Sequence, residues 1–373
     1  MLKACKYRMY PTKEQEEKFF QHFGACRFIY NWGLEQKIKT YEQDSKSISR
    51  FDLNKGITML KRDGKHDWLK EVNSQSLQGA TLNLDNAFTK FFREKKGFPK
   101  FKSRKNPVQA YNVPQNYKVD IENNRIYLPK IGNVKTILHR SLGDGDLKTA
   151  TVSRTSTGKY YISILVDDNR EFPEKSDFSV NDTVGVDVGI KNFAITSNGD
   201  KIDNPRHLKN SMEKLKVLSK RLSRKQKGSK NRNKARQQVA KFHEKIRNQR
   251  HDFQHKVSTK LVSENQAIAV ETLNVSGMLK NHCLAQHITD ASWASFITKL
   301  EYKAEWYGKT ILRIGRFEPS TKICNVCGFH NSSMTLADRK WKCPECNANH
   351  DRDINASINI KKFALQEQNL IGM

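Results

Sequence analysis

The sequence lacks long apolar segments. No run of about 18 apolar residues, the length that crosses a bilayer, occurs in the 373-residue chain. The basic N-terminus also lacks the apolar core of a secretory signal peptide. We therefore expect neither export nor membrane insertion, and a cytoplasmic protein without a membrane partner.

A disulfide framework is also missing. Of the seven cysteines, Cys5, Cys26 and Cys283 are scattered along the chain and odd in number. This usage fits the reducing cytosol better than a secreted, cross-linked domain. The other four cysteines belong to one motif.

Acidic residues are scarce relative to basic ones. The 39 aspartates and glutamates stand against 67 lysines and arginines, which gives a formal net charge of +28 at pH 7. Such a surface attracts polyanions, and nucleic acid is the commonest of them. The alternative is a small ribosomal-type or merely adhesive cationic protein. The length, with room for two or three domains, disfavours it, and 36% hydrophobic residues suffice for real cores.

The densest positive charge lies between Lys209 and Lys260, where 18 lysines and arginines accompany three acidic residues. An apolar stripe at helical spacing predicts two long helices with one packed seam and one basic face, joined near Gly228. A solvated charged face is the usual explanation of such a run, but solubility alone would mix the signs. We therefore favour phosphate binding. The candidate contacts are Lys220, Arg221, Arg224 and Lys225.

The N-terminal third predicts a strand followed by helices. Residues 2–10 form the strand, and Thr12 with Gln15 predicts a capping box that opens a helix. After a second helical stretch, residues 95–102 interleave aromatics with lysines. This suits base stacking, with Lys100 and Lys102 on phosphates. A loop simply anchored by its phenylalanines is an equally good explanation.

The hydrophobic period changes to two between residues 108 and 166. Two hairpins are predicted, with turns at Asn123-Asn124 and at residues 157–159. We expect a small β-barrel or sheet here, followed by a linker.

Two Cys-x-x-Cys pairs are separated by fifteen residues, a spacing typical of a closed tetrahedral zinc site. Such a site stabilises the fold and does no chemistry itself. Nearby His350 is either a supporting group or, more commonly, an ordinary loop histidine. The four candidate zinc ligands are Cys324, Cys327, Cys343 and Cys346.

Three acidic residues occupy unusual positions: Asp187 in the middle of an apolar strand, Glu271 at the end of another, and Asp353 at the start of a helix. Burying an acid is costly unless something pairs with it, and a divalent cation is a natural partner. Any one of these acids alone is more often structural. Converging carboxylates that hold two Mg²⁺ (or Mn²⁺) ions would suit phosphodiester hydrolysis, so the three on a basic chain favour a nuclease.

Three segments around these acids carry a resemblance to a known family. Gly185-Val-Asp187-Val-Gly-Ile-Lys-Asn-Phe, Val270-Glu271-x-Leu-Asn-Val-x-Gly-Met and Asp351-Arg-Asp353-Ile-Asn-Ala look like the three RuvC motifs of TnpB. TnpB proteins are transposon-encoded, RNA-guided nucleases of bacterial insertion sequences, related to type V CRISPR effectors. The segments Tyr10-Pro-Thr, Gly97-Phe-Pro-Lys-Phe-Lys and Pro319-Ser-Thr-Lys-x-Cys324 match in the family's order.

The resemblance implies a multidomain α+β and α/β protein. Its parts are an RNase H-like (RuvC) nuclease core with an inserted zinc ribbon of four cysteines, a β-barrel wedge domain and a helical recognition lobe. The expected boundaries are 1–10 and 108–178 for the wedge, 11–107 for the recognition domain, and 179–373 for the split RuvC domain, with a basic helical insert at 209–260 and the zinc ribbon at 320–349.

The resemblance also implies function. Asp187, Glu271 and Asp353 would bind the catalytic metals. A guide RNA from the transposon end would select a double-stranded DNA target next to a short adjacent motif. The protein would then be associated with the nucleoid. Asp351 competes with Asp353, but the Arg-Asp-x-Asn-Ala pattern favours Asp353, with Asp351 or Arg352 assisting. Thr272 replaces an acid common in the family, and we expect no effect on catalysis.

Two other functions stay open at this point. One is a guide-dependent DNA-binding repressor that retains the acids without cleaving. The other is an unguided transposase or resolvase. A tyrosine transposase needs metal-binding histidines, and the sequence has no His-x-His; a resolvase would not need the N-terminal lobe or the basic insert. Since all three acids are present, we expect an active nuclease.

Overall fold

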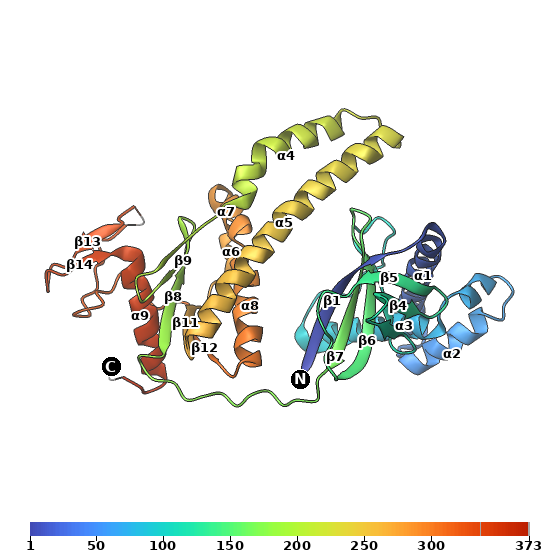
Figure 1. Cartoon of the computed structure of the whole chain (residues 1–373), viewed down its shortest axis with the longest axis horizontal. Helices are drawn as coiled ribbons and strands as arrows, with labels where there is room; N and C mark the ends of the chain where they lie inside the picture. The colour runs from blue at the N-terminus through green and yellow to red at the C-terminus, as the bar shows by residue number, and fades with distance from the viewer. Residues whose placement is uncertain (336, 372–373) are drawn as a thin grey trace. The chain divides into compact units, whose positions relative to one another are not determined.

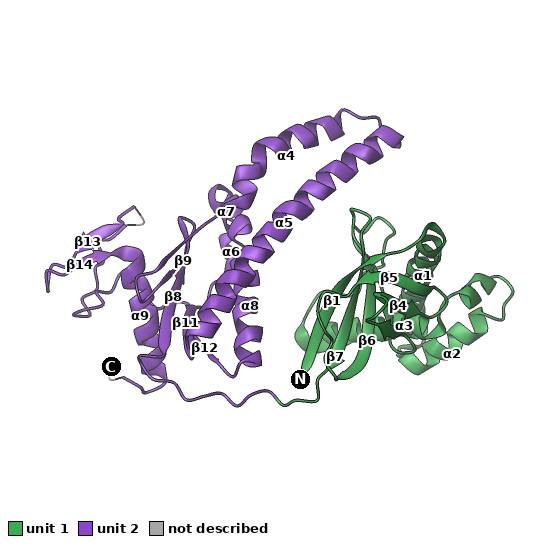
Figure 2. Ribbon diagram, viewed as in Figure 1, with its two compact units in different colours: residues 1–171 green, residues 172–373 purple. Residues whose placement is uncertain are grey.

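The chain forms two compact units in a computed structural model that describes residues 1–335 and 337–371. The first unit comprises residues 1–171 and the second residues 172–373 (Figure 2). Each unit has its own β-sheet and its own hydrophobic core.

An antiparallel sheet forms the centre of the first unit. Its strand order is β2-β6-β7-β1-β5-β4-β3. The predicted N-terminal strand, β1, pairs with β7 on one side and β5 on the other. The strands are β1 (Leu2–Tyr10), β2 (Gln109–Val113), β3 (Lys118–Asp120), β4 (Arg125–Leu128), β5 (Gly132–Ile137), β6 (Asp146–Arg154) and β7 (Tyr160–Asp167).

This sheet is open, so the β-barrel expected from the resemblance is not seen. β2 and β3 lie at opposite edges, and no pairing joins them in the described part of the chain. Closing a sheet needs edge strands that pair along a common register, and β3 has only three residues. Alternating apolar residues indicate which face of a strand is buried, but they do not indicate which strands end up at an edge.

Both predicted hairpins are present. β3 and β4 are joined by a turn that ends at Asn124, with φ of 50°, and β6 and β7 by a turn containing Gly158, with φ of 82°. Left-handed backbone is favourable for glycine and tolerated by asparagine, so the turn residues fix both hairpins.

Helices and sheet share one core in the first unit. The capping box at the start of α1 (Lys13–Asp44) is confirmed, because Thr12 and Gln15 exchange backbone-to-side-chain hydrogen bonds. Phe19 of α1 stacks on Tyr160 of β7 with 5.3 Å between ring centroids. The remaining helices are α2 (Arg50–Leu60), the short 3-10 helix η1 (Asp67–Glu71) and α3 (Ser74–Glu94).

The second unit is built on a mixed sheet in the order β10-β9-β8-β11-β12. β8, β11 and β12 are parallel, while β9 and β10 run antiparallel at one edge. The strands are β8 (Thr183–Val188), β9 (Asn192–Thr196), β10 (Lys201–Asp203), β11 (Ala267–Glu271) and β12 (Thr310–Ile314).

Helices cover both faces of this sheet (Figure 1). Ile268 and Val270 of β11 point into a core shared with α5, α7 and α8, whereas Ala267 and Ala269 point to a second core on which α9 packs. The sequence did not predict α6, α7 or α8. The helices of the second unit are α4 (His207–Ser223), α5 (Lys230–Glu264), α6 (Val275–Met278), α7 (His282–Ala291), α8 (Trp293–Trp306) and α9 (Arg352–Glu367).

The predicted pair of basic helices is α4 and α5, joined by a turn at Gly228 with φ of 87°. Their joined end extends away from the sheet (Figure 1). At the other end, Asp290 of α7 accepts hydrogen bonds from the backbone N–H groups of Leu208 and Lys209, at 2.9 and 3.1 Å. This carboxylate caps α4, whose first turn contains no acid of its own.

A small ribbon precedes α9, with β13 (Lys340–Lys342) and β14 (Asn349–Asp351) paired antiparallel. In the part of the chain that the structure describes, we find no helix long and apolar enough to cross a membrane.

Candidate active site and metal centre

Asp187 and Glu271 lie on neighbouring parallel strands. β8 and β11 pair in register up to Val186 and Val270, so the two acids are the next residues along that register. Because side chains alternate along a strand, and both valines point into the core beneath α5 and α8, the two acids face the opposite side. That is the side on which α9 packs.

Helix α9 brings the third acid, Asp353, in its first turn. It approaches β8 closely at Gly185, where a Cβ atom would lie 2.0 Å from the carbonyl oxygen of Ser357 and 2.9 Å from the Cβ of Lys361. Glycine permits this approach because it has no side chain. The contact sets the position of Asp353 relative to Asp187, two residues beyond Gly185.

The electrostatics of Asp187 indicate that the other two acids lie near it. Burial raises the pKa of Asp187 well above its usual range, the charges of Glu271 and Asp353 raise it further, and Arg352 and Arg339 partly offset the effect. Carboxylates act on one another in this way only over short distances. Three acids from distant segments therefore gather at one end of the sheet.

Two arginines hold Asp353. Arg352 donates to its Oδ1 from Nε at 2.9 Å and from a terminal nitrogen at 2.8 Å, and Arg339 donates to Oδ2 at 3.2 Å. Arg352 is buried, while the Arg339 side chain is about half exposed. Arg339 therefore lies between solvent and the acid cluster.

Asp351 has a different task. Its Oδ1 accepts hydrogen bonds from the N–H groups of Asp353 and Ile354, at 3.1 and 3.3 Å, and its Oδ2 pairs with Lys201 at 2.6 Å. It is the N-cap of α9. Because the Asp351 carboxylate already caps α9 and pairs with Lys201, Asp353 is the better candidate for the third acid of the site.

Glu271 is fixed by its surroundings. The Thr272 hydroxyl donates to the carbonyl oxygen of Ile314 at 2.9 Å, which joins the ends of β11 and β12. The Ser320 hydroxyl donates to the Glu271 carboxylate at 2.5 Å. No role for Ser320 was expected from the sequence, although it lies in the quoted Pro319-Ser-Thr-Lys segment.

The acid cluster fits a hard divalent cation in its donor chemistry. Carboxylate oxygens are the ligands that Mg²⁺ and Mn²⁺ prefer. Burial, and then the charges of Glu271 and Asp353, raise the pKa of Asp187 in spite of the two arginines, and a bound cation would oppose both effects. Asp187, Glu271 and Asp353 are the residues that would hold it.

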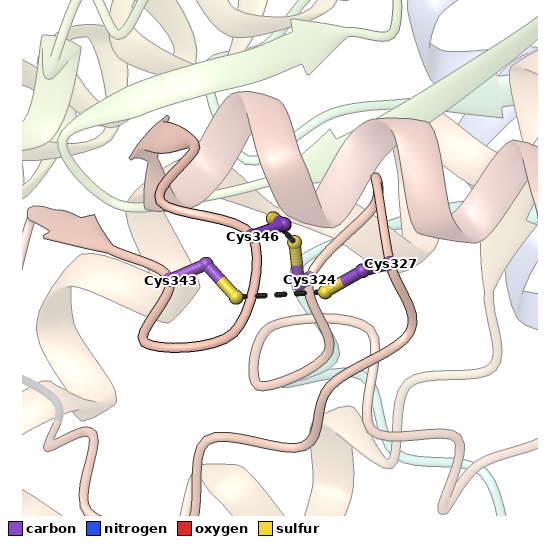
Figure 3. Close-up of side chains that lie close together, drawn as sticks. All are labelled: Cys324, Cys327, Cys343 and Cys346. Carbon is purple, nitrogen blue, oxygen red and sulfur yellow. Dashed lines mark hydrogen bonds between the residues drawn. The ribbon is translucent and has the colours of Figure 1, made fainter.

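The four predicted cysteines form a second, separate cluster. Cys324, Cys327, Cys343 and Cys346 place all their sulfur atoms within 4.8 Å of one another, and the four face a common centre (Figure 3). In the described residues they are the one group of three or more Cys, His, Asp or Glu side chains that meets this distance. The carboxylates of the acid cluster are thus more widely spaced.

Two tight turns present the sulfurs. The Cys324 carbonyl accepts from Gly328 N, and the Cys343 carbonyl accepts from Asn347 N, both at 2.9 Å. Gly328 and Asn347 each follow the second cysteine of a pair and have left-handed backbone, with φ of 82° and 61°. The two turns therefore have the same construction, which suits a single tetrahedral ion.

The thiols differ in acidity. Burial acts to raise the pKa of Cys343, but backbone N–H groups of Cys346 and Glu345 and the neighbouring thiols lower it to about 7. For Cys346, the Ala348 backbone lowers the pKa, while burial and the other three thiols raise it to about 12. Once one thiolate forms, its charge opposes the next, and a bound cation removes this conflict.

His350 contacts the cysteine cluster directly. Its Nε2 lies 3.1 Å from the Cys324 sulfur, and its ring lies 4.6 Å from that of Trp341. It is buried, and burial lowers its pKa. This contact with a cysteine sulfur favours the supporting role over that of an ordinary loop histidine.

The candidate nucleic-acid contacts are placed as follows. Lys220, Arg221, Arg224 and Lys225 are exposed at the joined end of α4 and α5. Arg232 donates to the carbonyls of Leu222 and Lys225, at 3.1 and 2.8 Å, and so satisfies the end of α4. The four cations are therefore displayed on an ordered turn.

Lys100 and Lys102 belong to an ordered loop. Phe98 packs edge-on against Phe88 and Phe91 of α3, while the Lys102 ammonium lies over the Tyr30 ring, 3.9 Å from its centroid. Phe101 is exposed. Phe98 anchors the loop on α3, and both Phe98 and Phe101 keep exposed surface on which a base could stack.

Three family models match this chain. One described as "Probable transposase" (OrfB of IS605) matches residues 163–282. "Cas12f1-like, TNB domain" matches residues 293–360, which include the cysteine cluster. "Helix-turn-helix domain" (also of OrfB) matches residues 1–46, which form β1 and α1 here.

Full-length relatives are similar as well. A Streptomyces pristinaespiralis protein named "Putative RNA-guided DNA endonuclease" is 37% identical over 96% of this chain and 88% of its own length. An Escherichia coli (strain K12) protein named "Putative RNA-guided DNA endonuclease InsQ" is 32% identical over 96% of this chain and 91% of its own.

Among solved structures, the Cas12f1 chain of a "Cas12f1-sgRNA-target DNA complex" has a TM-score of 0.59 at 15% identity and covers 97% of this chain and 98% of its own. This likeness shows a shared mixed α/β, multidomain fold. The resemblance noted from the sequence motifs is thereby confirmed: the chain belongs to the OrfB family of IS605-type elements, the TnpB-like proteins.

Proposed function

We propose that this protein is an RNA-guided DNA endonuclease of an IS605-type insertion element, and that it hydrolyses phosphodiester bonds with Mg²⁺ (or Mn²⁺). The observation that supports the proposal is that Asp187 and Glu271 follow paired residues of β8 and β11, while the charge of Asp353 at the start of α9 acts on Asp187. It occurs in a chain 37% identical to a relative with that printed name.

The residues have distinct parts in this proposal. Asp187, Glu271 and Asp353 would hold two divalent ions. Such ions, when bound, activate a water molecule and stabilise the leaving 3′-oxygen. Buried Arg352 fixes the Asp353 carboxylate, and half-exposed Arg339 supplies positive charge where a phosphodiester approaches the acids.

The proposed partners are a guide RNA from the transposon end and a double-stranded DNA target with an adjacent motif. The cations at the α4–α5 turn and the 95–102 loop would contact phosphates, independently of sequence. The four cysteines would hold a structural Zn²⁺ that shapes the ribbon. In domain terms, residues 179–373 are the proposed split RuvC domain, 11–107 the recognition domain, and 1–10 with 108–178 the wedge.

The test begins with the protein purified from a host that carries its own insertion element. RNA that co-purifies is sequenced, and a plasmid library is built in which randomised bases flank the matching target. Cleavage with Mg²⁺ is compared for wild type, Asp187→Ala and the control Asp200→Ala, whose carboxylate is exposed in a turn of the same unit. We expect cleavage by wild type and control, and none by Asp187→Ala.

Each other outcome removes a specific part of the proposal. Absence of bound RNA defeats RNA guidance and favours an unguided DNA enzyme. Bound RNA without cleavage by wild type favours a guide-dependent repressor. Cleavage that survives Asp187→Ala removes the metal site from the acid cluster.

A further inference from the structure

One buried hydroxyl contacts the acid cluster from outside the strands and helix that carry it. Ser320 is 2% exposed, and its Oγ donates to Glu271 Oε1 at 2.5 Å. A hydroxyl bound to a carboxylate at this length makes a charge-assisted hydrogen bond, which is stronger than a neutral one. The bond restricts the Glu271 carboxylate to one orientation.

Ser320 is itself held by the helix that carries Asp353. Asn359 of α9 is 1% exposed, and its Nδ2 donates to the carbonyls of Ser320 and Ile323, at 2.8 and 2.6 Å. A buried amide that spans two backbone carbonyls fixes both. The Ser320 backbone is therefore tied to α9, while its hydroxyl reaches Glu271.

The same helix also holds the first cysteine pair. Asn355, one turn before Asn359, donates to the Ile323 carbonyl at 2.7 Å, and its Oδ1 accepts from the Asn325 N–H at 2.9 Å. These two backbone groups flank Cys324. Residues 320–325 thus connect Glu271, α9 and the cysteine cluster through short hydrogen bonds, one of them buried and the others partly buried.

We propose that Ser320 is a positioning residue of the nuclease site: it orients Glu271 for metal binding and links that orientation to the zinc ribbon. The inference rests on the proposed function. If Ser320 only supplied a hydrogen bond to a buried acid, removal of its hydroxyl would change folding stability alone. A serine that aims a metal ligand changes the affinity for the metal, and removal of such a supporting hydrogen bond typically costs about 10- to 100-fold.

The experiment compares wild type with Ser320→Ala, Ser320→Thr and the control Ser333→Ala, an exposed serine of the same ribbon that bonds to neighbouring Asn331. Two readouts are used: Mn²⁺ binding to the purified protein, followed by electron paramagnetic resonance, and the Mg²⁺ concentration that gives half-maximal cleavage. Zinc content and thermal unfolding are measured on each variant.

We expect Ser320→Ala to weaken Mn²⁺ binding and raise the half-maximal Mg²⁺ concentration by roughly 10- to 100-fold, with zinc content and unfolding temperature close to wild type. Ser320→Thr keeps the hydroxyl and recovers most of the loss, and Ser333→Ala matches wild type. Unchanged metal affinity in Ser320→Ala overturns the inference, as does loss of zinc or folding that accounts for the whole effect. If wild type binds Mn²⁺ but does not cleave, the proposed function fails while the Mn²⁺ comparison still tests Ser320.

Discussion

Substituting Gly185 by alanine tests whether the close contact between β8 and α9 sets the acid cluster. The new Cβ would lie 2.0 Å from the Ser357 carbonyl oxygen, whereas ordinary contact starts at 3.4 Å. The nearest atom belongs to the backbone and cannot rotate away, so α9 must retreat by roughly 1 Å or more, at a cost of about 1–3 kcal/mol in the free energy of unfolding. Asp353 moves with the helix. A misplacement of about 1 Å in a catalytic constellation costs roughly 100-fold in rate.

The assay measures plasmid cleavage below the unfolding temperature of the variant, together with thermal unfolding. The matched control is Gly24→Ala in α1, where the nearest atom to an added Cβ is 3.9 Å away. Alanine is about 1 kcal/mol better than glycine inside a helix, so this control should keep full activity and equal or higher stability. Wild-type cleavage and stability in Gly185→Ala would refute the reasoning.

Three further perturbations give separate tests. Asp187→Asn should abolish cleavage yet raise the unfolding temperature of metal-free protein, because the charge of a buried carboxylate beside two other acids is removed. The stability advantage of Asp187→Asn over wild type should shrink as pH is lowered from 7, since the raised pKa of folded Asp187 makes it take up a proton at a higher pH than in the unfolded chain; calorimetry of both proteins against pH checks this. Cys343→Ser should lower zinc content and cleavage together, and unchanged cleavage by zinc-free protein would deny the ribbon a function. Asp290→Ala should uncap α4 at a cost of about 1 kcal/mol and speed hydrogen exchange at the Leu208 and Lys209 amides, whereas unchanged exchange would contradict the capping role.

Features that depend on neighbouring residues were predictable from the sequence. The capping box at Thr12, the turn at Asn124 and the two cysteine pairs each follow from side-chain chemistry within a few positions. The basic helical pair was predictable for the same reason, because its period and charge are local. Asp187 and Glu271 could be singled out since an acid in an apolar strand conflicts with burial.

Contacts between distant segments were not predictable in this way. The bond between Ser320 and Glu271 joins residues 49 positions apart, and the pairing of Arg339 with Asp353 depends on how the ribbon folds back on α9. The open edges of the first sheet have a similar origin, because a strand's own pattern does not specify which neighbours it lacks. These contacts arise from tertiary packing.

Arg339 and Arg352 would compete with a metal ion for the Asp353 carboxylate. In the free protein Arg339 and Arg352 are already counter-ions of that carboxylate, so a divalent ion must displace or share their bonds. Arg339 is accessible to solvent, and any polyanion that draws it away leaves Asp353 more available to metal. By thermodynamic linkage, the metal then strengthens polyanion binding by the same factor. A divalent cation and nucleic acid are therefore expected to bind cooperatively, with Arg339 as the shared element.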